Sequence, residues 1–590
     1  MSYTRKCLYI DLTKGKYEFK ETEKALIEKY IGAKGMGFAL LDRLNPSPDP
    51  LSPDNPLIFI NGPFTGTKIQ TSARTTLVTR SPLTGSALDS HCGGNFGPRM
   101  KFAGYDYIYI TGKAAKPTYL YIKEDNIEFH DASDLWGKGI YATNDELIKL
   151  HPGIDPRVAC IGPAGENLSH IACIGVDKHR QFGRGGSGAV MGAKNLKAVV
   201  LDGDIPVKYF DEEKFKVLNM EATKKILDNP GIKFRRIKGT MKCIRGCQTN
   251  HVLPTKNWSL VEFDEFEKIS SETTRQELNW KDTGCFNCAI RCSKWAKWDG
   301  HEIEGPEYET AALMGSNCMI ANIKDVALAN DICNELGMDT ISAGGTVGFA
   351  MECYEKGLLC DDFPVKLNWG NASAQRELLQ LMAFRKGAGQ IFADGTKVAA
   401  EKIGKGSEEI AINIYGMELS GINPLGSLTM GVAMAVADFA SHTRLWIAEQ
   451  EMGPEFKIED IVPTVIDGID TTNVRNSLVV CDFVPLPLDI FAGLLNAATG
   501  SNHTAKTLSE TGTRITHLAR RYNTRNGRKG KDDTLPGRFF NETTLSGFME
   551  GKKLEKRYFQ SFIDQYYQTR EWSNTGEPTT ETLSKHGIIA

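Results

Sequence analysis

The chain has 590 residues, of which 41% are hydrophobic and 24% charged, so it is long enough for two to four domains with large buried cores. Its formal net charge of -3 offers no global attraction to nucleic acids or anionic membranes. The amino-terminal stretch has no apolar segment with a cleavage site, and the longest apolar-rich run, residues 430–440, is too short to span a bilayer. We therefore expect a cytoplasmic protein without a membrane span and without a nucleic-acid partner.

Up to about residue 205 the sequence consists mainly of short runs typical of β-strands. They lie at residues 7–12, 17–19, 56–63, 75–82, 105–114, 118–132, 158–163 and 196–203. One or two helices are expected to interrupt these strands, most plausibly around residues 22–43 and 143–150. This pattern predicts a β-rich amino-terminal domain, residues 1–205, built from paired sheets.

After Asp204 the apolar residues recur at helical spacing. The clearest segments are residues 211–227, 325–336, 373–386 and 397–403. A second boundary is placed near residue 415, before a segment that contains glycine and proline. We therefore expect an α+β protein in which the β-rich domain is followed by two mainly helical domains, residues 206–415 and 416–590, with a cofactor at their interface.

Cys285, Cys288 and Cys292 form a C-x2-C-x3-C run, a spacing that no ordinary structural role requires. Three thiolates on such a tight loop can converge on one soft-metal centre but cannot readily pair as disulfides. A cubane iron–sulfur cluster takes four cysteines, and Cys481 is a candidate for a distant fourth ligand. Zinc sites more often combine two C-x2-C halves or include histidine. An iron–sulfur cluster is favoured, with zinc and a coincidental spacing as the alternatives.

Gly183, Gly185 and Gly188 match the dinucleotide-binding pattern G-x-G-x-x-G. The preceding residues are polar and do not predict the strand that a Rossmann unit needs, and the next strand follows too closely. The backbone N–H groups of such a loop, with the guanidinium of Arg184, can instead bind another anionic group, above all phosphate. A tight structural turn is the alternative interpretation.

A second candidate ligand loop lies within residues 72–106 and carries Arg74 and His91. The adjacent glycines Gly93 and Gly94 permit close approach of the backbone to a ligand. Taken alone, such a segment is more often a simple turn.

Glu309 lies at the start of a predicted helix, and His442 follows an apolar helical stretch. A carboxylate and an imidazole are the usual pair for proton transfer. Each also has a simpler explanation, because a glutamate at a helix start is stabilised by the helix dipole and a lone histidine is often part of a core. Both residues are candidates for acid–base chemistry.

Two segments far apart in the chain share one pattern. Residues 334–339 (NELGMD) and 476–481 (NSLVVC) each begin with asparagine and end, after four intervening residues, in a potential ligand, Asp339 or Cys481. Such twin loops indicate a ligand with two similar halves.

Taken together, these motifs resemble the family of tungsten-dependent aldehyde:ferredoxin oxidoreductases. The family's marks are C-x2-C-x3-C with a remote cysteine, twin D-x-x-G-L-[DC] loops, a GPEYE segment and R-G-G-x-G-A-V-M-G-x-K-N-L-K-A. They correspond here to the cysteine run with Cys481, the loops 334–339 and 476–481, residues 305–309 and residues 184–198. Further similarity at residues 62–67, 81–85, 160–166 and 572–583 extends the resemblance over essentially the whole chain.

The resemblance implies a tungsten centre with two pterins, with molybdenum as the alternative metal, close to a [4Fe–4S] cluster. A magnesium ion would bridge the two pterin phosphates. The residues that would hold the pterins and their phosphates are Arg74, His91, Gly93, Arg184, Gly185, Asn334, Asp339 and Asn476. The cluster ligands would be Cys285, Cys288, Cys292 and Cys481.

The reaction that the resemblance implies converts an aldehyde and water into a carboxylic acid, two electrons and protons. Glu309 would accept a proton, and His442 would hydrogen-bond the oxygen and stabilise developing negative charge. The electrons would pass through the cluster to ferredoxin or to an iron–sulfur partner subunit.

Three departures from the family pattern stand out. Both loops carry asparagine, Asn334 and Asn476, where the pattern favours aspartate, so an amide replaces a carboxylate that could accept two pterin N–H groups. Val479 replaces the glycine of the second loop. The E-x-x-H pair that can hold an iron between subunits reads Leu328 and Asp331. That inter-subunit iron site is therefore expected to be missing. This leaves dimerisation open: a homodimer or hetero-oligomer remains an option without a bridging iron.

Two alternatives follow from these observations. One is a sibling tungsten enzyme that reduces a thioester-activated substrate. The other, suggested by Asn334 and Asn476, is a non-catalytic iron–sulfur electron-transfer subunit whose pterin site has decayed.

Overall fold

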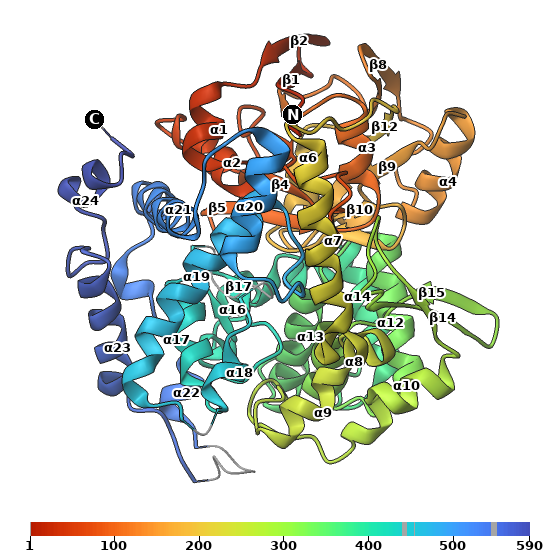
Figure 1. The fold of residues 1–590 in the computed structure, drawn as a ribbon. Coiled ribbons are helices and arrows are strands. Elements are labelled where there is room, and N and C mark those ends of the chain that lie inside the picture. Colours follow the sequence, from red (N-terminus) through yellow and green to blue (C-terminus); the bar gives the residue numbers. More distant parts are fainter. Residues whose placement is uncertain (1, 361, 439–444, 454, 544–550, 590) are drawn as a thin grey trace.

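The computed structural model describes residues 2–360, 362–438, 445–453, 455–543 and 551–589 (Figure 1). Two six-stranded sheets form its amino-terminal part. The first sheet contains β1 (Lys6–Asp11), β2 (Lys16–Glu21), β3 (Leu57–Ile60), β4 (Thr75–Arg80), β5 (Ala87–Cys92) and β6 (Tyr107–Thr111). The second contains β7 (Thr118–Lys123), β8 (Asn126–Asp131), β9 (Arg157–Cys160), β10 (Ile174–Val176), β11 (Arg180–Phe182) and β12 (Leu196–Asp202).

The two sheets repeat one topology. Their strand orders are β2-β1-β6-β3-β4-β5 and β8-β7-β12-β9-β10-β11. In each sheet one pair is parallel, β1 with β6 and β7 with β12, and the remaining pairs are antiparallel. A short helix precedes the last strand of each repeat, α3 (Phe96–Phe102) and α6 (Ser187–Ala193). Corresponding loops of the two repeats can therefore form two similar surfaces for one ligand.

The sheets face each other across one hydrophobic core. Leu8 and Phe59 of the first sheet belong to the same buried cluster as Leu120 and Val199 of the second. The outer face of the first sheet is covered by α2 (Ala33–Asp42) and α21 (Ala505–Arg525), and that of the second by α4 (Ile140–Leu150). This arrangement confirms the expected β-rich domain with paired sheets.

Most predicted strands are present, but β5, β10 and β11 were missed. They are short or rich in polar residues, so they lack the apolar alternation on which the prediction relied. The expectation that no strand precedes the glycine-rich loop was wrong, because β11 lies there. The Rossmann interpretation nevertheless fails, since β11 pairs antiparallel with β10 and no parallel βαβ unit surrounds the loop.

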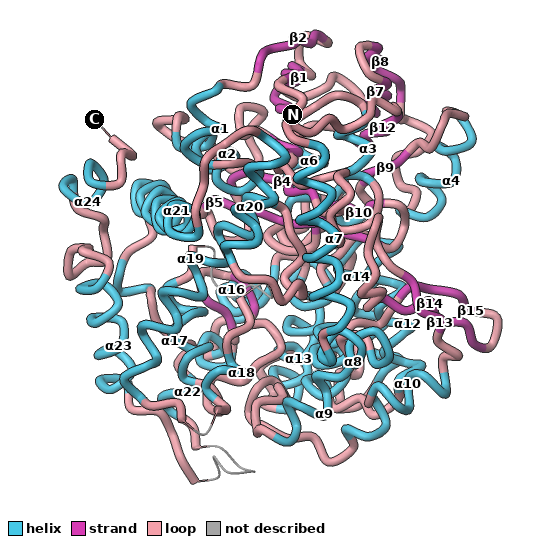
Figure 2. The backbone as a smooth tube through the Cα atoms, in the orientation of Figure 1, coloured by secondary structure: helices cyan, strands magenta, loops and turns pink. Residues whose placement is uncertain are grey.

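Helices dominate the rest of the described chain, as predicted (Figure 2). The longer ones are α7 (Glu212–Asp228), α8 (Pro230–Lys238), α9 (Lys242–Thr249), α12 (Ile323–Leu336), α13 (Thr340–Glu355), α14 (Ala372–Ala383), α16 (Gly395–Ile403), α17 (Leu428–Val436), α19 (Ile461–Leu478), α20 (Leu488–Thr499) and α23 (Lys556–Thr569). Small strands β13 (Lys281–Thr283), β14 (Ser293–Trp298) and β15 (His301–Glu304) flank the cysteine run. Among the described residues, no helix combines the length and apolar character needed to cross a membrane.

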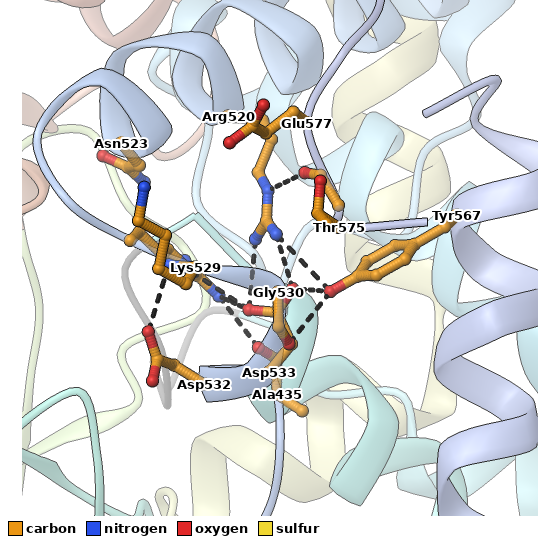
Figure 3. Close-up of polar contacts among 12 residues, drawn as sticks. Ala435, Arg520, Asn523, Lys529, Gly530, Asp532, Asp533, Tyr567, Thr575 and Glu577 are labelled. Carbon is orange, nitrogen blue, oxygen red and sulfur yellow. Dashed lines mark hydrogen bonds and ion pairs between the residues drawn. The ribbon is translucent and has the colours of Figure 1, made fainter. Parts of the chain in front are cut away.

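A buried ion cluster joins the carboxy-terminal helices to α17. The guanidinium of Arg520 approaches Asp533 at 2.7 Å, and the hydroxyl of Tyr567 donates to the same carboxylate (Figure 3). Arg528 also pairs with Asp533, at 3.0 Å. It donates to the carbonyl oxygen of Ala435 in the last turn of α17 and to those of Ala437 and Asp438 just beyond that helix. Such a buried cluster fixes the arrangement of its side chains, because removal of one charged group would leave its partner buried without a compensating charge.

Candidate active site

A cavity of about 710 Å³ lies between the sheets and the helices. Segments between Thr71 and Pro485 contribute to its wall. The predicted site residues that line it are Arg74, His91, Gly93, Arg184, Cys285, Cys288, Cys292, Glu309, Asn334, Asp339 and Cys481. Gly185 and Asn476 are not among the residues that line it, and His442 lies outside the described residues. Candidates from six separate motifs of the sequence thus line one cavity.

The four cysteine thiols of the predicted cluster site are free and partly buried. Burial, with the neighbouring thiols of Cys481 and Cys285, raises the pKa of Cys288 to about 11. Burial, the carboxylate of Glu307 and the same two thiols raise the pKa of Cys292 well above its usual value. Because both Cys288 and Cys292 resist ionisation in the unliganded protein, a cationic metal centre would favour their thiolate forms.

Two features of the amino-terminal domain complete the thiol site. The guanidinium of Arg74 lies 3.5 Å from the sulfur of Cys481 and 3.1 Å from the carboxylate of Asp482. A Cβ atom on Gly93 would lie 2.8 Å from the sulfur of Cys285, so any side chain there would displace the thiol. Among the described residues, no three histidine, cysteine, aspartate or glutamate side chains are grouped so as to hold a single metal ion. Four thiols around one cavity match the ligand set of a cubane cluster.

The twin loops have the same backbone geometry. The N–H groups of Gly337 and Met338 both donate to the carbonyl oxygen of Cys333 at 2.9 Å at the end of α12. At the end of α19 the N–H groups of Val479 and Val480 donate to the carbonyl of Arg475 in the same way. Both loops therefore turn back through a left-handed residue, as Schellman motifs do.

Each twin loop packs on one repeat of the sheet domain. A Cβ atom on Gly162 would lie 2.5 Å from the carbonyl oxygen of Leu336, and one on Gly62 would lie 2.6 Å from that of Ser477. Both glycines precede proline and follow the third strand of their repeat, β9 and β3. Such close backbone approach permits only glycine.

The asparagines that begin the loops contact equivalent strands. The carboxamide of Gln181 in β11 donates to Oδ1 of Asn334 at 2.6 Å. In the other repeat the side-chain nitrogen of Asn476 lies 3.5 Å from the carboxylate of Asp89 in β5, which also binds the ring of His91 at 2.6 Å. Oδ1 of Asn476 is buried and has no hydrogen-bond partner among the described residues. An orphaned acceptor of this kind suits a ligand N–H group.

Arg184 and Asp339 join the glycine-rich loop to the first twin loop. Nε of Arg184 donates to Asp339 at 3.1 Å, and its terminal nitrogen donates to the carbonyl of Glu418. The carboxylate of Asp339 also accepts the N–H groups of Ile341 and Ser342 at the start of α13. Asp339 is thereby engaged as a helix cap, which the sequence pattern did not indicate.

Glu309 is the buried carboxyl group of the cavity. It lies in the short helix α11 (Tyr308–Thr310), which continues into a π-helical turn, residues 311–315. Such turns occur often at functional sites. The N–H of Gly421 donates to its carboxylate at 2.7 Å. Burial raises the pKa of Glu309 to about 7, although the Gly421 hydrogen bond and Arg184 oppose the rise.

Three functional residues escaped the sequence prediction: Arg180 and Gln181, which line the cavity, and Asp89, which contacts the ring of the cavity residue His91. The repeat of the two sheets was the signal that could have found them, because Gln181 occupies in β11 the register position that His91 occupies in β5. Arg180 pairs with Glu304, and the thiols of Cys285 and Cys292 lie near its guanidinium.

Two family models match almost the whole chain. "Aldehyde ferredoxin oxidoreductase, N-terminal domain" covers residues 7–203, and "Aldehyde ferredoxin oxidoreductase, domains 2 & 3" covers residues 217–588. The chain belongs to the aldehyde ferredoxin oxidoreductase family. The tungsten-containing aldehyde ferredoxin oxidoreductase of Pyrococcus furiosus is 35% identical, and that of Thermococcus kodakarensis 33% identical, each over 98% of both chains. The expected family is thereby confirmed.

A solved relative has the same fold over its full length. It is described as "Active site complex BamBC of Benzoyl Coenzyme A reductase in complex with 1,5 Dienoyl-CoA", with a TM-score of 0.87 and 26% identity. The similarity covers 100% of this chain and 97% of that one. The α+β architecture of the aldehyde ferredoxin oxidoreductase family thus also occurs in a protein with a different named reaction.

Proposed function

We propose that this protein is a tungstopterin oxidoreductase that interconverts an aldehyde and its carboxylic acid. The electrons would leave through a [4Fe–4S] cluster to ferredoxin or to an iron–sulfur partner subunit. One observation carries the proposal: the buried carboxyl group of Glu309 lines the same cavity as the four cysteine thiols. An oxidation of this kind needs a proton acceptor and an electron exit within one enclosure. The tungsten named in the curated relatives supports the choice of metal.

The cofactors would be held by groups already described. Cys285, Cys288, Cys292 and Cys481 would bind the cluster. One pterin would lie against the first sheet and the second twin loop, and the other against the second sheet and the first twin loop. The pterin residues would be Arg74, His91, Gly93, Arg184, Gly185, Asn334, Asp339 and Asn476, with a magnesium ion between the two phosphates. The partnerless Oδ1 of Asn476 supports this assignment, because a ring N–H could satisfy it.

When bound, the metal centre, tungsten or alternatively molybdenum, would supply the two-electron redox chemistry. With a pKa of about 7, Glu309 is present near neutral pH in both protonated and ionised forms. Its carboxylate can therefore accept the proton of water that attacks the carbonyl carbon, and its acid form can return a proton in the reverse direction. The N–H of Gly421 holds the carboxylate in position throughout. His442 is the proposed partner of Glu309.

A second candidate is reduction of a thioester-activated ring. It is favoured by the full-length similarity to the benzoyl coenzyme A reductase complex at a TM-score of 0.87. A third is an electron-transfer subunit without pterin chemistry, which the two loop asparagines suggest. The buried Glu309 favours the aldehyde reaction over this third candidate, since pure electron transfer needs no proton acceptor.

The deciding experiment is metal and pterin analysis followed by an assay with viologen and a panel of aldehydes. Tungsten or molybdenum with about two pterins per chain and aldehyde-dependent viologen reduction are expected. Metal without aldehyde turnover, but with turnover of an aryl thioester, would favour the second candidate. Absence of both metals after growth with them would leave only the electron-transfer subunit.

Glu309→Gln tests the proposed base. We expect a fall of about 10²- to 10⁴-fold in kcat, the usual contribution of a general base. Glu352→Gln is the matched control, because Glu352 is also a buried glutamate but pairs with Arg538 away from the cavity. Normal turnover in the Glu309 variant would exclude this role.

A further inference from the structure

Exposed apolar side chains concentrate on two consecutive helices. Of fifteen large hydrophobic residues that the structure describes as exposed, seven lie between residues 205 and 237. Five of them, which we call the α7–α8 face, are between 37% and 59% exposed: Val217, Met220, Leu227, Phe234 and Ile237. The three on α7 recur at about helical spacing, and the two on α8 are three residues apart. A concentrated apolar surface of this kind marks an interaction site rather than ordinary scatter.

The opposite side of the same helices packs on the cysteine run. Phe215, Ile226 and Ile232 share a buried cluster with Ile290, and Cys288, Cys292 and Cys481 pack against that cluster. Figure 1 shows α7 running down the front of the molecule, with α8 below it. The α7–α8 face is therefore separated from the thiols by one helix, a layer about 10–12 Å thick.

Polar contacts tie α8 to the cysteine run directly. A terminal nitrogen of Arg236 donates to the carbonyl oxygen of Ala289, and Nζ of Lys294 donates to that of Arg236 at 2.7 Å. A Cβ atom on Gly239, just after α8, would lie 2.9 Å from the carbonyl oxygen of Cys292. A partner seated on α8 would thus have a short, packed connection to the cluster site.

The two helices carry a net positive charge, because residues 212–238 include eight basic and four acidic residues. Between residues 224 and 238 the chain has six basic residues and one acidic residue, although its overall formal charge is -3. Lys224, Lys225 and Lys233 are exposed. Local positive charge attracts an acidic partner and accelerates its encounter.

We propose that the α7–α8 face is the docking surface for a small acidic iron–sulfur protein. The inference rests on the proposed function, in which the cysteine run holds an electron-carrying cluster. In each encounter one electron passes from this reduced cluster to the oxidised centre of the partner, with no bond made or broken. The two electrons of one aldehyde oxidation would therefore take two such transfers. A second copy of this chain is the poorer occupant, because a two-fold interface would place the same basic residues against each other.

The test compares Met220→Glu and Ile237→Glu with the control Ile154→Glu in the purified holoenzyme. Ile154 is 59% exposed, as is Met220, but lies near the second sheet, away from α7 and α8. The probe is an acidic ferredoxin with two [4Fe–4S] clusters, and the readouts are its calorimetric Kd and its KM as acceptor. We expect both constants to rise at least tenfold in the two face variants, with viologen-linked turnover within twofold of wild type. Added salt should weaken ferredoxin binding to the wild type.

Three outcomes would overturn the proposal: an unchanged ferredoxin Kd in both face variants, an equal loss in Ile154→Glu, or conversion of a dimer into monomers with ferredoxin kinetics unchanged. The last would assign the face to a second copy. The binding measurement does not depend on turnover. Failure of the aldehyde reaction with ferredoxin binding intact would therefore count against the proposed function and not against the docking surface.

Discussion

Gly337 and Val479 occupy equivalent positions in the twin loops, each in the left-handed region, with φ of 80° and 60°. Glycine adopts this conformation freely, whereas a β-branched residue is strained there. Val479 is nevertheless fully buried. The second loop therefore keeps the shape of the first while carrying a side chain that the family pattern does not favour.

Replacing Val479 by glycine weighs strain against burial. The change relieves about 1–2 kcal/mol of left-handed strain, but removes a buried side chain worth about 2–3 kcal/mol and adds about 0.5–1 kcal/mol of glycine entropy. We expect Val479→Gly to destabilise the protein by about 1–2 kcal/mol, measured as the shift in denaturation midpoint. A more stable variant would show that strain dominates. In the opposite loop, Gly337→Ala should lose about 1–2 kcal/mol from strain alone.

Asp89 explains why the second loop begins with an amide. Asn476→Asp would place a second buried carboxylate within about 3.5 Å of Asp89, and we expect a loss of about 2–4 kcal/mol. Asn334→Asp is the matched control, because the Oδ1 atom at that position accepts from Gln181 and a carboxylate could do the same. Thermal denaturation of both variants checks this difference. Equal losses would contradict the explanation.

The pH dependence of turnover should report Glu309. Its pKa of about 7 means that the carboxylate required for aldehyde oxidation is lost as the pH falls through 7. We expect kcat/KM for oxidation to rise with pH up to about 7 and then level, and the acid-reducing direction to show the opposite trend. Profiles measured with a viologen acceptor test this. A flat profile between pH 5.5 and 8.5, values that bracket this pKa by about 1.5 units, would rule out Glu309 as the titrating base.

The assignment of Cys481 as the fourth cluster ligand can be tested by iron content. Cys481→Ser should lower bound iron and abolish or change the low-temperature electron paramagnetic resonance signal of the reduced cluster, because the cubane cluster takes four thiolates. Cys360→Ser is the control, since Cys360 is an exposed free thiol. Wild-type iron and an unchanged spectrum in Cys481→Ser would place the fourth ligand elsewhere.

The buried Arg520–Asp533–Arg528 cluster should control the stability of the carboxy-terminal part. Asp533→Asn leaves two buried guanidinium groups under-compensated, at a cost of about 3–5 kcal/mol. Although burial opposes it, the charge of Arg528 and Arg520 holds the pKa of Asp533 below its usual value. This stability is therefore present above the unfolded-state pKa and is lost as the pH falls, so the difference between wild type and variant should shrink in acid.

The control for this cluster is Asp532→Asn. Asp532 is a neighbour that accepts only local backbone contacts from Lys529 in the described structure, and its loss should change stability by no more than about 0.5 kcal/mol. Urea denaturation at pH 7 and at pH 4 separates the two aspartates. Equal losses of unfolding free energy in both variants would contradict the proposed role of Asp533 in stabilising this part of the protein.

Local spacing in the sequence was sufficient for several elements of the site. The cysteine run, the twin loops and the start of α11 are each defined by residues within a few positions of one another. The kind of ligand group that each supplies can therefore be predicted without knowledge of the fold. The class of the fold was likewise predictable, because strand-like alternation before residue 205 and helical spacing after it are properties of short windows. The short polar strands β5, β10 and β11 were not, since they are stabilised by their neighbours in the sheet rather than by their own pattern.

The tertiary structure alone decided which of these segments meet. Arg74 lies beside Cys481, Gln181 beside Asn334 and Asp89 beside Asn476, and no local pattern encodes such contacts between distant residues. They arise because the carboxy-terminal end of one helix, α12 or α19, packs against each of the two sheet repeats, at glycines that permit close backbone contact. The sequence by itself therefore determined the kinds of ligand groups and the family they resemble. The packing of the two repeats against the twin loops determined that these groups surround one cavity, because only the folded core sets the distances between them.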